Sequence, residues 1–537
     1  MRAQNRAIPK EVIAAELRKW VEENDDDIIT GFLTLSGFDP TKDTPVEILH
    51  TFLLGIVKYV WHATHSSWSE DQKNLYALRL QSTIRDRMSI PEIRSRYIMQ
   101  YVNSLIGRQL KTVIQCSIFH LYDLVDDDML RVWKVVGELS ALVWVPEIRN
   151  LTEYISDIDI GVANVLDAFA QVDPSKIPAK SKLHLLTHLV EDIKRFGPLV
   201  GLSTEVFESF NSVFRACSIL SNHLAPSRDI ALQLADQEGL KQRTSRGWWY
   251  SPTLGKWVQA GPGVQDFIKS QPKFRRSLGW ADNPSPHIGS VKLSPIPSED
   301  SKRQQTRPSL LLESTEVANV INRNEYNLQS RVFTCQSLVA RSGDDCRVGT
   351  WVVAASVSVD GQTVIGRIAG IYQLVEQPQA GRPNMTVLEL FKVSEHCHNT
   401  LNLPVLYQPQ QENVMIAITP EKVHFNFNAQ HDCCLAQCES TGVKQRQQER
   451  QDSNVTEIFV EHKPLKRFII NLNSFHNAHL IREALPRELV QPRLIFPERE
   501  AHHFKCAQAL RRDQGIRAAQ AAARKRAREE VENEDSD

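Results

Sequence analysis

The sequence predicts an α+β protein in which a mostly helical N-terminal half is followed by a linker and a small β-rich domain. Three observations predict this fold class. Apolar residues recur at helical spacing through residues 1–245. Over residues 246–330 proline, glycine and serine become frequent and the periodicity is lost. Runs of β-branched and aromatic residues, separated by turns, follow over residues 331–500.

The helical half contains long apolar segments. Val46–Val60 is nearly all apolar and predicts a buried helix. Apolar residues from Ile98 to Ile114 also recur at helical spacing. Val132–Val145 predicts a further apolar helix, which Pro146 ends. The same period continues in Asp157–Phe169 and Leu183–Arg195.

The C-terminal half carries the strand signals. Asp360-Gly361 lies between the runs VSV and TVIG, which is a strong hairpin signal. Runs such as TVLELFKV and VHFNF favour a small antiparallel sheet or barrel. Residues 501–537 are rich in alanine and predict a helical or disordered tail, basic at Ala523–Arg528 and then acidic. The basic cluster is typical of a nuclear-import signal or a nucleic-acid arm, with a solvated helix as the alternative.

Composition excludes several classes of protein. The 537 residues include 63 basic and 64 acidic side chains, so the net charge is −1 and any nucleic-acid surface must be local. Nine cysteines without a signal peptide do not indicate a secreted disulfide framework. We find no apolar run of about 18 residues, the length that a membrane span needs. The cytosol or the nucleus is therefore the expected compartment.

Two groups of acidic residues are candidates for catalysis. Glu205 and Glu208 are three residues apart in TEVFESFNSVFR and share one helix face, whose phenylalanines should pack inward. Solvated surface charge is the alternative interpretation. Asp43, Glu47 and His50 are spaced four and three apart at the start of the apolar segment. An ordinary helix start with Pro45 accounts for Asp43, but explains Glu47 and His50 less well.

Cysteine and histidine cluster in the β-rich domain. His431, Cys433 and Cys438 are followed downstream by His476. Together these four residues offer the nitrogen and sulfur ligands of a tetrahedral Zn²⁺ site. The spacing is not that of a standard zinc finger, and a turn with half-buried cysteines is the alternative.

Basic and aromatic residues meet near the start of the predicted linker. Cations beside aromatic rings can bind phosphates and stack on bases. Tryptophans that dock the linker on the helical domain are the alternative. The candidate DNA-binding residues here and in the tail are Arg243, Arg246, Trp248, Trp249, Arg524, Lys525 and Arg526.

Several segments also carry a family resemblance. DTPVEILHTFLLGIVKYVW is followed by KLHLLTHLVEDIKRFGP and EVFESFNSVFRACSILSNHLAPSRDIA, and later by FNFNAQHDCCLAQCESTG and RFIINLNSFHNAHLIREALPRELV. In these segments the chain resembles fungal DNA transposases of the Plavaka group, which are related to CACTA-type elements. The resemblance covers roughly residues 30–250 and 330–495.

The resemblance implies an RNase H-like core of the DDE type, in which two aspartates and a glutamate hold two Mg²⁺ ions. The helical half would then be the helical insertion and the end of that core. Glu47-Ile48-Leu49-His50 has the family's acid-x-x-His form with Glu in place of Asp. Asp43 is the expected second acid with Glu47 as substitute, and Glu208 is the expected final glutamate with Glu205 in reserve.

One departure from the family pattern shapes the functional prediction. The first catalytic aspartate belongs on a strand well before the second acid, and the segment before Asp43 looks helical and linker-like. We therefore expect the C-terminal portion of a transposase, either degenerate or truncated, whose DNA recombination chemistry is inactive alone.

The predicted function is that of a nuclear, transposase-derived DNA-binding protein. DNA is its expected partner, with a homo-oligomer left open and neither a membrane nor a small-molecule substrate expected. The alternative is a non-enzymatic nuclear factor that binds chromatin or another protein.

Overall fold

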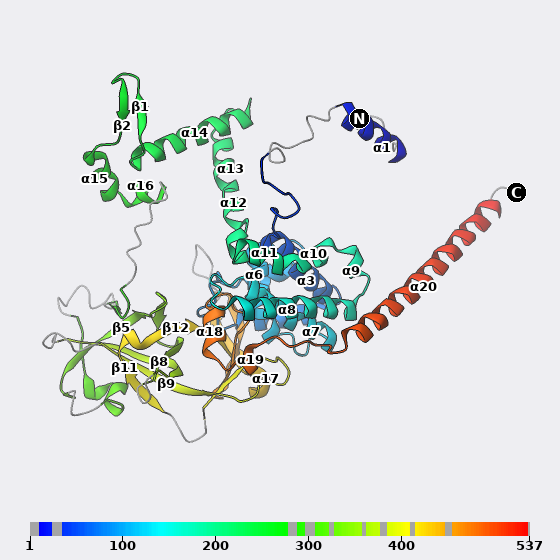
Figure 1. Ribbon diagram of the computed structural model, residues 1–537. Helices are drawn as coiled ribbons and strands as arrows, with labels where there is room; N and C mark the ends of the chain where they lie inside the picture. Colours follow the sequence, from blue (N-terminus) through cyan, green and yellow to red (C-terminus); the bar gives the residue numbers. More distant parts are fainter. Residues whose placement is uncertain are drawn as a thin grey trace.

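Helices make up the N-terminal half and strands dominate the C-terminal half, as predicted (Figure 1). The computed structural model describes residues 10–23, 35–277, 287–295, 307–321, 327–356, 361–375, 384–408, 414–445 and 454–534. Among these residues, no helix combines the length and the apolar character that crossing a membrane requires.

The helical body surrounds the apolar segments that the sequence singles out. The apolar run at Val46–Val60 contains a π-helix, which is buried on nearly all sides, and the start of an α-helix, which is buried along one side. The helices are α1 (Lys10–Glu23), η2 (Leu49–Val57), α3 (Lys58–His65), α4 (Glu70–Gln81), α5 (Ser95–Gln100), α6 (Gly107–Cys116), η3 (Ser117–Phe119), α7 (Asp127–Val143), α8 (Leu151–Val172), α9 (Lys176–Ala179), α10 (Ser181–Leu185), η4 (Leu186–His188), α11 (Leu189–Phe196) and η5 (Leu199–Leu202).

The segment from Ile98 to Ile114 is two helices and not one. α5 ends at Gln100 and α6 begins at Gly107. Gly107 stands directly against η2, since a Cβ there would lie 2.6 Å from Leu49 Cδ1. The helical spacing suggested a continuous helix because apolar residues of both helices and of the turn between them lie in the same core.

The predicted linker contains regular elements. Its first part, together with the last three helices of the predicted helical region, projects from the helical body in Figure 1, and we call residues 205–277 the arm. The arm comprises α12 (Glu205–Ser209), α13 (Asn211–Ile219), α14 (Pro226–Thr244), β1 (Trp249–Ser251), β2 (Lys256–Val258), α15 (Pro262–Ser270) and α16 (Pro272–Ser277). The second part supplies β3 (Val291–Leu293), β4 (Leu310–Leu311), η6 (Leu312–Ser314) and η7 (Glu316–Asn319) to the β-rich region.

The β-rich region is built on an antiparallel sheet, which has 12 strands within the described residues. The strands β7 (Trp351–Ala355) and β8 (Thr363–Leu374) form the hairpin predicted around Asp360-Gly361, although Asp360 itself lies outside the described residues. The remaining elements are β5 (Arg331–Val339), β6 (Asp345–Arg347), β7 (Trp351–Ala355), β8 (Thr363–Leu374), β9 (Met385–Val393), β10 (Val405–Tyr407), β11 (Met415–Ile418), η8 (Pro420–Lys422), β12 (Val423–Phe427), β13 (Ala429–His431), α17 (Cys433–Ala436), β14 (Glu439–Gln445), β15 (Thr456–Glu461), β16 (Arg467–Ile470), α18 (Ala478–Ala484), α19 (Arg487–Val490) and α20 (Arg499–Glu534).

One hydrophobic core joins the two halves. Along β7, Trp351 and Val353 enter the core that includes the helices, whereas Val352 and Ala354 enter a second core on the other face of the sheet. This alternation follows from the two-residue period of a strand. The helical body and the sheet are therefore packed together and are not separated by a flexible connection.

The C-terminal segment returns to the helical body. In α8, the Asp167 carboxylate has no exposed surface and accepts bonds from Arg499 Nε (2.7 Å), Arg499 Nη2 (3.0 Å) and His503 Nε2 (2.7 Å) of α20. Burial alone would raise the pKa of Asp167, but the bonds from Arg499 and His503 hold it below its usual range. Beyond this anchor α20 extends away from the body (Figure 1).

We expect Asp167→Asn to lower the free energy of unfolding by about 2 kcal/mol at pH 7, because charge-assisted hydrogen bonds are lost. A carboxylate with a depressed pKa stabilises the folded state above its unfolded pKa of about 3.9, and this stabilisation is lost as the pH falls through the folded pKa. The difference between wild type and variant should therefore shrink in urea denaturation below about pH 4. Asp71→Asn, at an exposed position on α4, is the matched control and should change little. An Asp167→Asn difference that stays constant down to pH 2 would contradict the assignment.

Candidate functional site

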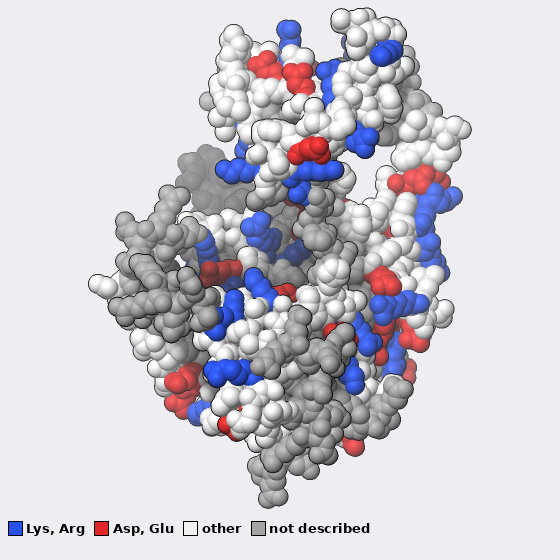
Figure 2. Space-filling view, turned by 90° about the vertical axis from the view of Figure 1, so that its left-hand side faces the viewer, with Lys and Arg blue, Asp and Glu red and all other residues white. Residues whose placement is uncertain are grey.

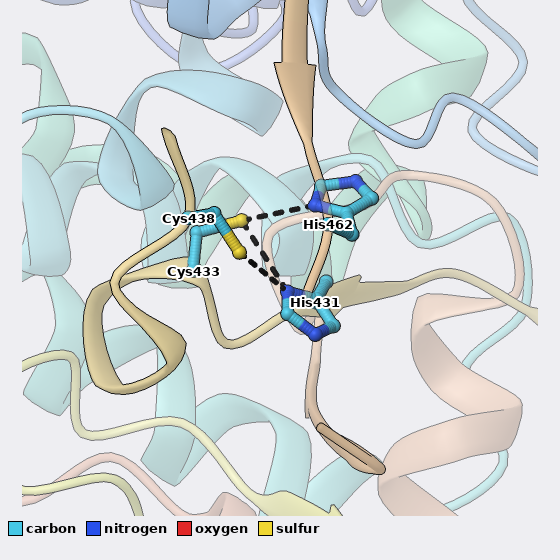
Figure 3. Close-up of side chains that lie close together, drawn as sticks. All are labelled: His431, Cys433, Cys438 and His462. Carbon is cyan, nitrogen blue, oxygen red and sulfur yellow. Dashed lines mark hydrogen bonds between the residues drawn. The ribbon is translucent and has the colours of Figure 1, made fainter. Parts of the chain in front are cut away.

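Two histidines and two cysteines meet where the β14–β15 hairpin leaves the sheet (Figure 3). One potential ligand atom of each of His431, Cys433, Cys438 and His462 lies within 4.8 Å of those of the others. Cys433 Sγ is 3.3 Å from His462 Nδ1 and 3.5 Å from His431 Nδ1, and Cys438 Sγ is 3.5 Å from His431 Nδ1. Zn²⁺ binds sulfur at about 2.3 Å and nitrogen at about 2.0–2.1 Å, so the ligand atoms of a tetrahedral site lie about 3.3–3.8 Å apart. The three separations match this geometry.

Local backbone geometry brings the ligands together. Asp432 caps α17 by accepting a bond from Leu435 N, and Gln437 then adopts a left-handed conformation with φ of 51°. This turn returns the chain, so that Cys438 N donates to Cys433 O at 3.2 Å. His462 follows β15 directly and lies beside Cys438 because Glu439 pairs with Glu461 in the hairpin.

The surroundings of His431 and Cys433 affect how these residues could bind a metal. His431 Nε2 lies 3.1 Å from Leu465 O, and a carbonyl can only accept, so the proton is on Nε2 and Nδ1 is available as a ligand. Burial lowers the pKa of His431 and keeps the ring neutral. Burial and the nearby Cys438 raise the pKa of the Cys433 thiol, so a thiolate pair here requires a compensating cation.

The predicted fourth ligand, His476, is wrong, because this residue lies outside the cluster. Its Nε2 is 2.8 Å from Asn426 Oδ1, and its Nδ1 is 3.3 Å from Ser89 Oγ. The sequence favoured His476 because His476 and His479 form an H-x2-H pair downstream of the cysteines. His462 could have been identified from the two strands β14 and β15, which form a hairpin. Extending the pairing of this hairpin by one residue places residue 462 opposite residue 438.

A second group of side chains joins the start of η2 to the base of the arm. His50 Nδ1 lies 2.8 Å from Glu47 Oε2, and His50 Nε2 lies 2.8 Å from Glu208 Oε1. One imidazole ring therefore separates two carboxylates that are more than 150 residues apart in the chain. We call Glu47, His50 and Glu208 the carboxylate–histidine cluster.

Glu47 is held firmly, whereas the other two side chains are open to solvent. Glu47 accepts the backbone N–H groups of Leu49 (2.7 Å), His50 (2.7 Å) and Thr204 (2.9 Å). Burial raises the pKa of Glu47, but these bonds outweigh it and leave the pKa below the usual range. The side chains of His50 and Glu208 are 51% and 45% exposed, so both can rotate without disturbing the core.

The other predicted acids have different partners. Asp43 forms an ion pair with Arg195 of α11 and accepts a bond from Asp39 N at 2.7 Å. Glu205 pairs with Lys111 of α6 at 2.5 Å. Of the sequence-predicted set, Glu47, His50 and Glu208 are the residues that contact one another, and Glu205 lies one helical turn from Glu208.

The phenylalanines near Glu208 do not pack inward as expected. Phe207 is 74% exposed, Phe210 45% and Phe214 41%. The helical period was read correctly, but α12 and α13 leave the body and offer no core for this face. The bonds of Glu205 and Glu208 instead fasten the base of the arm to α6 and η2.

The arm presents the predicted nucleic-acid residues. Trp248 and Trp257 are 58% and 64% exposed and are not docked on the helical body. The Arg243 guanidinium lies over the Trp249 ring at 5.5 Å. Arg246 has a left-handed backbone, with φ of 65°, at the turn before β1. In the tail, Arg524 is exposed on α20, and the side chains of Lys525 and Arg526 lie outside the described residues.

Charge is mixed over the face shown in Figure 2, where Lys and Arg side chains alternate with Asp and Glu. The arm is therefore distinguished by exposed aromatic rings that lie beside individual cations, and not by a uniformly basic surface.

Comparison with known proteins adds one family match. Residues 291–490 match a family described as a domain of unknown function (DUF8590). The match runs from the start of β3 to the end of α19 and includes all four residues of the cysteine–histidine cluster. No curated protein and no solved structure matches the chain.

Proposed function

We propose that this chain is a transposase-derived DNA-binding protein with a structural zinc centre and the remainder of a Mg²⁺ site. The observation that carries the proposal is the carboxylate–histidine cluster. The acid-x-x-His segment and the segment Phe207-Glu208-Ser209-Phe210 both lie in the stretches that resemble Plavaka-type transposases. Their side chains meet at Glu47, His50 and Glu208.

The residues present can accommodate a divalent ion after one rearrangement. Mg²⁺ prefers carboxylate oxygens and retains several waters. The His50 ring stands between the carboxylates of Glu47 and Glu208, and its exposed position allows it to turn away. When bound, such an ion would activate a water molecule or stabilise a leaving oxygen. Glu47 would hold its position through the backbone N–H bonds, and Glu208 would close from the arm.

DNA binding is proposed here, and strand transfer is not. Two-metal chemistry in a DDE core uses three acids, and the cluster supplies two carboxylates. The zinc centre has four protein ligands and leaves no position for substrate, which is typical of a structural site. Its role would be to fix the β14–β15 hairpin to the sheet. Nuclear localisation is part of the proposal and follows from binding DNA.

We expect Trp248→Ala and Trp257→Ala each to weaken binding of single-stranded DNA about ten-fold, because stacking on an exposed ring contributes about 1–3 kcal/mol per base. Arg243→Ala should reduce the magnitude of the salt slope by about 0.7 if this side chain neutralises one phosphate. Fluorescence anisotropy with a labelled oligonucleotide measures both effects.

Tyr97→Ala provides the matched control for the tryptophans, since Tyr97 is 45% exposed on the helical body. Absence of DNA binding at low salt would refute the proposed function. Equal losses for Tyr97→Ala and Trp248→Ala would refute the assignment to the arm.

A second candidate function is protein binding without catalysis. The exposed apolar side chains of the arm favour it, in particular Ile219 at 72%, Leu220 at 78% and Leu224 at 86%. Apolar surface of this kind marks interaction sites. If a second copy covers it, sedimentation equilibrium will show a dimer that Leu220→Asp and Leu224→Asp disrupt.

A further inference from the structure

Three side chains from distant parts of the chain form a serine–histidine–aspartate arrangement. Ser89 Oγ lies 3.3 Å from His476 Nδ1, and His476 Nε2 lies 3.3 Å from Asp344 Oδ1. All three residues line one cavity of about 540 Å³ between the α4–α5 loop and the β-rich region. Neither the zinc centre nor the carboxylate–histidine cluster includes any of them.

The hydrogen bonds determine which ring nitrogen carries the proton. His476 Nε2 faces two acceptors, Asn426 Oδ1 at 2.8 Å and Asp344 Oδ1. Asn477 Nδ2, which is 3.2 Å from the same nitrogen, has its own acceptors in Asp344 Oδ2 and Asn426 O. Nε2 therefore carries the hydrogen, and Nδ1 presents its lone pair to the Ser89 hydroxyl. The ring is reversed relative to the serine-protease arrangement, but either nitrogen can act as base when the other is protonated.

Asp344 is ionised and held in place. Burial by itself would raise its pKa, but bonds from His476, Ser342 and Asn477 lower the pKa to about 2. A fixed carboxylate beside Nε2 stabilises the imidazolium that forms when Nδ1 takes up a proton.

The loop that carries Ser89 is held in an unusual conformation. Ser89 has φ of 52° and Arg87 has φ of 60°, and neither is glycine. Backbone conformations of this kind are strained for residues other than glycine and concentrate at functional sites. The loop keeps Ser89 exposed at the cavity, with Arg85 and Arg87 next to it.

We propose that Ser89 is the nucleophile of a site that hydrolyses carboxylic esters, with His476 as general base and Asp344 as its positioning partner. Arg85 is exposed at the cavity and offers positive charge to the developing oxyanion, whereas Arg87 is paired with Asp86. Asp86 and Asp345 also line the cavity, so its charge is nearly balanced and suits a neutral polar ester better than an anionic one.

The reaction balances with water as the second substrate. Ser89 Oγ attacks the carbonyl carbon and its proton passes to His476 Nδ1. The bond from carbon to the alcohol oxygen breaks, and the alcohol leaves with that proton. Water then attacks the Ser89 ester and gives a proton to Nδ1. The carboxylic acid departs, and Oγ recovers the proton.

The test uses 4-nitrophenyl acetate as substrate and a fluorophosphonate as covalent label on the full-length protein. We expect wild type to be labelled at Ser89, as mapped by peptide mass spectrometry, and to hydrolyse the ester. Ser89→Ala and Ser89→Gly should abolish both, and the glycine variant also relieves the left-handed backbone. His476→Gln should lower the rate about a hundred-fold. Ser104→Ala, at an exposed serine on the same body, should retain label and rate.

Circular dichroism confirms that each variant is folded before its rate is compared. Wild type without label on Ser89, or hydrolysis no faster than that of folded Ser89→Ala or Ser89→Gly, overturns the proposal. This outcome is independent of DNA binding and of metal content, because the three residues take part in neither.

Discussion

Cys433→Ser is expected to abolish zinc binding at the site that we propose for His431, Cys433, Cys438 and His462. The thiolate supplies one of four ligands, and a tetrahedral site with three ligands holds zinc far more weakly. Metal analysis of purified protein should give about one zinc per wild-type chain and close to none in the variant. Because the site joins the hairpin to the sheet, we also expect the melting temperature to fall by at least about 5 °C.

The chain provides close controls for this prediction. Cys434 is adjacent and exposed but lies outside the cluster, so Cys434→Ser should keep its zinc. His462→Gln should lose zinc and His476→Gln should keep it, which separates the ligand set of the structure from that expected from spacing. Wild-type protein that is purified without chelator and contains no zinc would contradict the assignment. So would equal zinc content in all four variants.

Glu47→Gln and Glu208→Gln are each expected to weaken Mn²⁺ binding at least about ten-fold, because each removes an anionic oxygen ligand from the proposed divalent site. Mn²⁺ substitutes for Mg²⁺ and can be followed by electron paramagnetic resonance in the zinc-loaded protein. His50→Ala should bind Mn²⁺ as tightly as wild type or more so, since it removes the ring that separates the two carboxylates.

Glu205→Gln is the matched control for the Mn²⁺ titration. Glu205 lies on the same helix as Glu208 but pairs with Lys111, so its loss should leave Mn²⁺ affinity unchanged. If His50→Ala abolishes binding, His50 is itself the ligand and the proposed carboxylate site is wrong. If Glu205→Gln weakens Mn²⁺ binding as much as Glu208→Gln, the loss results from reduced negative charge on the arm and not from loss of a ligand.

Local patterns in the sequence predicted much of the fold. The β-branched runs became β8, β9, β12 and β16, and Val132–Val145 falls on α7 apart from its last two residues. These predictions are correct because the apolar residues recur at the period of the helix or strand that they form and lie on its buried face. The same reasoning failed at Ile98–Ile114, where two helices and a turn all face one core. The spacing of apolar residues indicates which side chains are buried. Here the buried side chains belong to two helices, so the spacing does not reveal the turn between them.

Contacts across the chain were harder to predict. His462 joins the cluster through strand pairing, which no ligand-spacing pattern contains. Asp43 was the preferred second acid, with Glu47 as substitute, but Arg195 from a helix about 150 residues away pairs with Asp43. The short strand β3 pairs with β5 although it lies in the predicted linker, because an isolated three-residue strand gives little signal in the sequence.

The most direct test of the account is a crystal structure of the protein soaked in Mn²⁺, with anomalous scattering to locate the ion. We expect an anomalous peak between the carboxylates of Glu47 and Glu208, with the His50 ring turned away from both. A map with no peak at this position, in which His50 still bridges the two carboxylates at saturating Mn²⁺, would contradict it.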